Sequence, residues 1–112
     1  MLIDSHLHIG LNNWTEEYLL NYLDSNHIDK GWILTWEESN PAVPEHYIPL
    51  DIEMVKKAYK NHPDRIVPFY APDPGRENWK EGLQGCLDEG FAGCAELKVS
   101  YRRDDPKVLS LL

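Results

Sequence analysis

The spacing of hydrophobic residues alternates along the chain between a period of two and a period of about 3.6. A period of two indicates a strand, because successive strand side chains point to opposite faces, whereas the longer period indicates a helix. The pattern predicts strands at residues 2–8, 31–36, 65–71 and 93–99. It predicts helices over residues 14–25, from Asp51 to the region of Pro63, from Trp79 to Leu87, and from Asp104 or Asp105 onward.

Residues typical of helix ends and loops support these boundaries. Asn13 is the predicted N-cap of the first helix, and Pro63 ends the second because proline cannot continue a helix. Gly90 is the expected stop of the third helix, and Pro106 fits the first turn of the last one. The polar, proline-rich stretch 37–49 is predicted to be a loop.

Strands and helices that alternate in this order are typical of an α/β fold with a parallel sheet. Four βα units in 112 residues give about 28 residues per unit, close to the repeat of a (β/α)₈ barrel of about 250 residues. An open doubly wound sheet is the alternative, but it usually has a glycine-rich turn after its first strand, where this chain has only Gly10. We therefore expect residues 1–112 to be a single partial domain, the N-terminal half of a (β/α)₈ TIM barrel that ends within its fourth helix.

Charge and composition narrow the classes of partner. The chain has 11 Lys and Arg against 19 Asp and Glu, a formal net charge of −8, which disfavours nucleic acid as a partner. Its apolar runs fall short of the roughly 18 residues of a membrane span, and its start does not resemble a signal peptide. Cys86 and Cys94 are expected to be free thiols, as is typical of a cytoplasmic protein.

The first predicted strand carries ionisable residues where an interior strand usually has aliphatic ones. Asp4, His6 and His8 alternate, so their side chains share one face. Burial of such a row is costly unless a partner satisfies it, and a metal ion would be one. We expect His6 and His8 to be metal ligands. Asp4 is expected to accept a hydrogen bond from a ligand imidazole or to position the strand. The alternative is that both histidines are structural. The opposite face of the strand is apolar: Ile3, Leu7 and Ile9.

Three segments resemble one family of enzymes. IDSHLHIG (residues 3–10) resembles the D-x-H-x-H opening strand of the amidohydrolase superfamily, and NHPDRIVPFYAPDP (61–74) and EGFAGCAELKVS (89–100) resemble its amidohydrolase-related branch. The resemblance implies a metal-dependent hydrolase on a TIM barrel, with His6 and His8 as ligands and a metal-activated water that attacks a small-molecule substrate. It also implies that further ligands and the general base come from the second half of the barrel. We expect a divalent cofactor, with zinc as the leading candidate and one or two ions.

The fourth predicted strand adds two candidates for metal or catalytic roles. Glu96 and Lys98 share a face with Cys94, and that face is expected to point into the barrel with the histidines. Some members of the superfamily use a carboxylated strand-four lysine to bridge two metals, whereas the related TatD-type nucleases use a strand-four glutamate. A mutually neutralising ion pair between Glu96 and Lys98 is the structural alternative.

Two further residues are candidates for substrate binding. His46 lies in the loop after the second strand, on the side where barrels keep their active sites. Trp36 ends that strand and either lines a pocket or belongs to the core.

Three other functions stay open at this stage. One is a TatD-type nuclease or another phosphoesterase, and a second is a related metal-dependent decarboxylase with the same ligands. The third is an inactive half barrel that forms a homo-oligomer, because half a barrel leaves two unpaired parallel edges.

Overall fold

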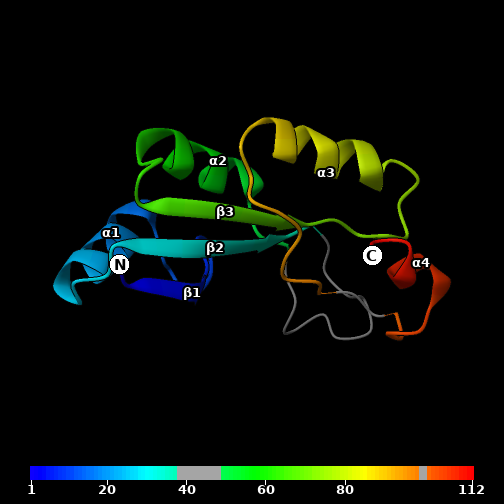
Figure 1. Ribbon diagram of the computed structural model, residues 1–112, viewed down its shortest axis with the longest axis horizontal. Helices are drawn as coiled ribbons and strands as arrows, with labels where there is room; N and C mark the ends of the chain where they lie inside the picture. The colour runs from blue at the N-terminus through cyan, green and yellow to red at the C-terminus, as the bar shows by residue number, and fades with distance from the viewer. Residues whose placement is uncertain (38–48, 99–100) are drawn as a thin grey trace.

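The computed structural model describes residues 1–37, 49–98 and 101–112 (Figure 1). These residues form a three-stranded parallel sheet in the order β1-β2-β3, which confirms the predicted α/β class with parallel strands. The strands are β1 (Ile3–Leu7), β2 (Lys30–Trp36) and β3 (Ile66–Ala71). The helices are α1 (Glu16–Ser25), α2 (Ile52–Asn61), α3 (Trp79–Asp88) and α4 (Pro106–Leu109).

The main hydrophobic core lies between one face of the sheet and the helices α1, α2 and α3. Alternate residues of each strand face these helices, as the period of two requires. Its fully buried members include Leu19 and Leu23 of α1, Val55 and Ala58 of α2, and Ile33 and Ile66 of the sheet. A smaller buried cluster of Trp36, Leu50 and Ala71 closes the carboxyl end of β2 and β3. Among the helices described, none is long and apolar enough to cross a membrane.

The prediction of a fourth strand over residues 93–99 is wrong for the part that the structure describes. Gly93 forms a single parallel bridge with Phe69, supported by hydrogen bonds from Tyr70 N–H to Gly93 O and from Ala92 N–H to Pro68 O. Pairing stops there, because Pro72 follows the end of β3 and has no N–H with which to continue the ladder. Residues 94–98 instead cross the carboxyl end of the sheet as an irregular segment (Figure 1).

The helix ends are partly as predicted. Asp51 and Asp105 cap α2 and α4 through their side chains. The prediction that Asn13 caps the first helix is wrong: Asn13 has a φ of 63°, and Thr15, with an extended backbone, accepts a hydrogen bond from Tyr18 N–H as the N-cap. An N-cap residue has an extended backbone, which Thr15 has and Asn13, in the left-handed region, does not, so α1 starts later than predicted.

Strand β1 is at the edge of the sheet in the described residues, not in its interior as the sequence suggested. Leu7 and Ile9 are buried against the helices as predicted, but Ile3 is 40% exposed because only β2 lies beside it. The pairing of β1 with β2 shifts between Asp4 and Leu7, so three steps along β1 match two along β2. A shift of this kind is typical of a β-bulge, and it lies between Asp4 and Leu7, an interval that contains His6.

Two glycines, one within α3 and one just after it, provide a test of this packing. Gly90 has a φ of +103°, and a Cβ there would lie 2.7 Å from Tyr59 Oη, so Gly90→Ala is expected to lower the free energy of unfolding by about 1–3 kcal/mol. Gly85 lies inside α3 and a Cβ there meets nothing within 4 Å, so Gly85→Ala is expected to raise it by about 0.5–1 kcal/mol. Urea unfolding of both variants measures the difference. Equal effects would contradict the placement of Gly90.

Candidate metal centre

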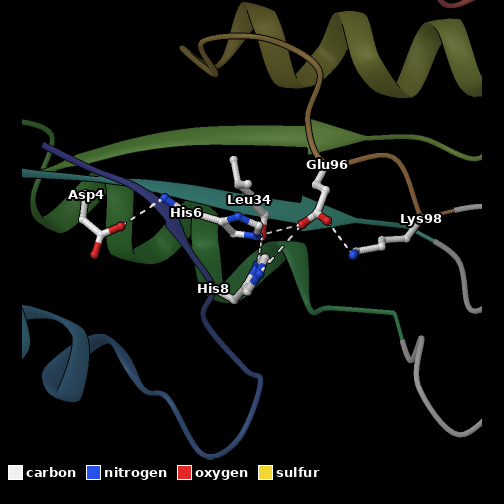
Figure 2. A network of polar contacts seen from close by, with 6 residues as sticks. All are labelled: Asp4, His6, His8, Leu34, Glu96 and Lys98. Atoms are coloured by element: carbon white, nitrogen blue, oxygen red, sulfur yellow. Dashed lines mark hydrogen bonds and ion pairs between the residues drawn. The ribbon is translucent and has the colours of Figure 1, made fainter.

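Strand β1 and the residue that follows it deliver two imidazoles, His6 and His8, to the carboxyl end of the sheet. The rings of His6 and His8 lie edge to face, with centroids 5.1 Å apart. His8 Nδ1 lies 2.8 Å from the carbonyl oxygen of Leu34 in β2, so the ring donates a proton there and leaves Nε2 as the free acceptor atom (Figure 2). A backbone carbonyl in this position is the usual way to fix the tautomer of a metal-binding histidine.

Glu96 approaches both imidazoles from the segment that follows α3 (Figure 2). Its Oε2 atom lies 3.0 Å from His6 Nε2 and 3.9 Å from His8 Nε2. One carboxylate oxygen therefore faces two ring nitrogens that come from residues 88 to 90 positions earlier in the chain. The side chains differ in exposure, 59% for His6, 17% for His8 and 26% for Glu96, so the cluster opens to solvent on the side of His6.

Lys98 holds the other oxygen of the same carboxylate. Its Nζ atom lies 2.5 Å from Glu96 Oε1 and 5.6 Å from the centroid of the Trp36 ring. Partial burial tends to raise the pKa of Glu96, but the hydrogen bond and charge of Lys98, together with the two imidazoles, outweigh it and hold the pKa below its usual value. The carboxylate is therefore kept ionised, which is the form that binds a cation.

The remaining residues predicted for the site have different positions. Asp4 does not contact an imidazole; its Oδ1 accepts a hydrogen bond from the backbone N–H of His6. Trp36 is 3% exposed, and its ring contacts the ring of His8 with centroids 5.1 Å apart, so it forms the floor of the cluster. His46 lies outside the described residues.

The cluster has the donor set of a divalent transition metal. One ligand atom from each of His6, His8 and Glu96 lies within 4.8 Å of the others. A zinc ion with bonds of about 2.0–2.2 Å in tetrahedral geometry needs its ligand atoms about 3.4 Å apart, so small side-chain rotations suffice to close the set. Two histidines and one glutamate are a known ligand combination of catalytic zinc sites.

Sequence reasoning missed two contributors to this centre. The carbonyl of Leu34 leaves no signal in the sequence, because any residue supplies the same backbone oxygen. Tyr22 keeps the helical spacing of Leu19 and Leu23, a pattern that indicates a core residue, yet its hydroxyl donates to Asp4 Oδ2 at 2.8 Å. A tyrosine hydroxyl near a sheet usually finds a polar partner, so the residue type itself was the available signal.

Comparisons with known proteins agree with the barrel-like arrangement. The chain matches no protein-family model, and a search of curated proteins finds no match. It superposes on a crystal structure of a probable 2-pyrone-4,6-dicarboxylic acid hydrolase from Acinetobacter baumannii with citric acid bound, with a TM-score of 0.59 and 15% identity. The match covers 99% of this chain and 44% of that one, so the chain spans less than half the length of this neighbour. At this identity the likeness establishes the fold alone.

The role of Lys98 generates a pH prediction for the metal-free chain. Because the folded-state pKa of Glu96 is lowered, its contribution to stability is present above the unfolded pKa and is lost as the pH falls through the folded pKa. Lys98→Met is expected to raise the folded pKa toward the unfolded one, so the pH-dependent contribution of Glu96 becomes smaller and its loss is complete at a higher pH. Titration of the Glu96 carboxyl carbon by NMR, with urea unfolding at each pH, measures both effects.

Lys80→Met is the matched control for this experiment. Lys80 is an exposed lysine on α3, and its Nζ atom lies 5.4 Å from the ring centroid of the adjacent residue, Trp79. It has the same charge and the same kind of ring contact, but it lies outside the cluster. A shift of the Glu96 titration in both variants would assign the effect to net charge and contradict a local role of Lys98.

Proposed function

We propose that this chain is part of a metal-dependent hydrolase of the amidohydrolase superfamily that acts on a small-molecule substrate. The observation that carries the proposal is the convergence of His6, His8 and Glu96 at the carboxyl end of a parallel sheet. Barrel enzymes have their active sites at that end of the strands. The D-x-H-x-H pattern of β1 and the likeness of the fold to a protein named as a hydrolase support the same assignment.

A divalent ion, zinc in the first instance, fits this donor set. Nε2 of His6, Nε2 of His8 and a carboxylate oxygen of Glu96 would hold it. When bound, such an ion lowers the pKa of a coordinated water toward neutrality and polarises the bond to be hydrolysed.

The residues around the ligands have separate tasks in this proposal. The Leu34 carbonyl keeps the proton of His8 on Nδ1, which leaves Nε2 ready to bind without a change of tautomer. Lys98 keeps Glu96 ionised, and the buried ring of Trp36 excludes water from the inner side of His8. The exposed side of His6 is then the direction from which substrate and water arrive.

Other ligands and the general base are proposed to come from barrel units outside these 112 residues. In the superfamily that the sequence resembles, they follow strands five, six and eight. The 44% coverage of the structural neighbour is in line with this proposal. We therefore treat metal binding as the activity to test on this chain, and catalysis as a property of the complete barrel.

Metal content is the decisive measurement for this proposal. The chain, purified without chelator or affinity metal and dialysed against Zn²⁺, is expected to retain about one ion per chain by mass spectrometry, because three protein ligands are typical of a catalytic zinc site. The His6→Ala/His8→Ala double variant is expected to retain almost none, since it keeps one ligand of three. Wild-type protein that folds and binds no ion would overturn the proposal.

The control replaces His27 and His62, two histidines that lie outside the cluster in the described residues. His27 has a φ of 56°, in the left-handed region that asparagine tolerates, so it is replaced by Asn. His62 pairs with Glu16, so it is replaced by Gln, which keeps a polar partner for that carboxylate. This variant is expected to bind zinc like the wild type. Loss of zinc binding in this variant would show that histidines outside the cluster bind the metal, and it would contradict the proposed centre.

A second candidate function is a phosphoesterase of the TatD type. The observation that favours it is that Glu96, rather than Lys98, lies beside the imidazoles, because TatD-type nucleases use a strand-four glutamate. The net charge of −8 disfavours a polynucleotide as substrate.

Model substrates distinguish the hydrolase from the phosphoesterase. The assay uses a zinc-loaded protein that contains the complete barrel. If the protein is a hydrolase of the amidohydrolase type, zinc-dependent turnover of carboxylic esters and lactones is expected to exceed that of bis(p-nitrophenyl) phosphate by at least tenfold. Spectrophotometric assays with the His6→Ala/His8→Ala variant as blank measure the ratio. A ratio in the opposite direction would select the phosphoesterase.

A further inference from the structure

The backbone of β1 is irregular at the position of one metal ligand. Three steps from Asp4 to Leu7 match two from Gly31 to Ile33, so one extra residue is accommodated in β1. A bulge bends its strand and changes the direction of the side chains within it, and bulges recur beside active sites for this reason. The orientation of His6 therefore depends on what holds this irregular backbone.

Asp4 provides that support from within the same strand. The backbone N–H of His6 donates to Asp4 Oδ1 at 3.1 Å, so a side-chain acceptor within the strand holds this part of the backbone (Figure 2). Asp4 has no such hold on His8, whose ring is fixed instead by the carbonyl of Leu34. The two ligands are thus positioned by different means.

The carboxylate of Asp4 is itself oriented from helix α1. Tyr22 donates its hydroxyl proton to Asp4 Oδ2 at 2.8 Å, so each carboxylate oxygen has one fixed partner. The Tyr22 ring packs against Trp14, with centroids 5.3 Å apart, which places the hydroxyl without help from the metal ligands. The chain of contacts runs from helix α1 through Tyr22 and Asp4 to the backbone of His6.

From this geometry we infer that Tyr22 is a positioning residue for metal binding, which acts through Asp4 to hold the β1 bulge and so orient His6. The inference deepens the proposed function and rests on it. It assigns a role in the centre to a helix residue that contacts none of the three ligand side chains in the described part of the chain.

The test removes one oxygen atom. Tyr22→Phe keeps the ring against Trp14 but cannot donate to Asp4, so Zn²⁺ and Co²⁺ affinity is expected to fall about tenfold, the low end for a residue behind a metal ligand. In the metal-free chain the NMR signals of the His6 amide and ring are expected to move, with those of His8 little changed. The thermal midpoint is expected to stay close to that of the wild type.

Tyr18→Phe is the matched control. Tyr18 is on the same helix and its ring also contacts Trp14, at 4.8 Å, but its hydroxyl is not the donor to Asp4. This variant is expected to leave metal affinity and the His6 signals unchanged. Asp4→Ala serves as the second variant: once the carboxylate is absent, adding Tyr22→Phe is expected to cause no further loss of affinity.

The outcomes separate this inference from the proposed function. If the wild type binds zinc and Tyr22→Phe binds it equally well, the inference is overturned and the function stands. If the wild type binds no zinc, the proposed function and the role of Tyr22 in metal binding both fail, and the His6 signals of the metal-free chain test only whether Tyr22 positions His6. Unchanged His6 signals in Tyr22→Phe, or equal changes in Tyr18→Phe, would then overturn that positioning as well.

Discussion

The contact between the Glu96 carboxylate and the two imidazoles of β1 is the interaction on which the candidate site depends. It joins residues 90 positions apart, and it lies where the fold provides little backbone pairing, since residues 94–98 leave the sheet after Gly93. A partly buried carboxylate is costly unless it is paired. Lys98 on one oxygen and the histidines on the other supply the partners, so charge pairing rather than a strand ladder determines where this segment crosses the sheet.

The two histidines differ in how firmly they are held. His8 is largely buried, lies against Trp36 and has its tautomer fixed by a carbonyl. His6 is mostly exposed, and its support is indirect, through a bulge and the side chains behind it. A centre built from one rigid ligand and one exposed ligand keeps its geometry while leaving an open side, which is the arrangement that catalytic metal sites require.

Local signals made the elements predictable, whereas the site depended on long-range contacts. The caps at Asp51 and Asp105 and the alternation in β1 were readable because each acts within a few residues. Alternation also identified Glu96 and Lys98 as candidates. That Glu96, and not Lys98, contacts the imidazoles is a result of the tertiary structure, which the local pattern does not contain. The fourth strand was predicted from the local alternation of residues 93–99, and residues 94–98 did not form it. A strand needs backbone N–H and C=O groups to pair with along its whole length, and Pro72, directly after β3, has no N–H to offer.

The alternation of the strands also explains how stability and chemistry are separated in so small a chain. In β1, Leu7 faces the helices and is buried, whereas Asp4 and His6 face away from that core. The residues that hold the sheet to its helices are thus different from those that form the site, although they are adjacent in sequence. A polar cluster can therefore occupy the end of the sheet without a cost to the core. The hydroxyl of Tyr22 links the two sides, because it reaches from a helix to Asp4.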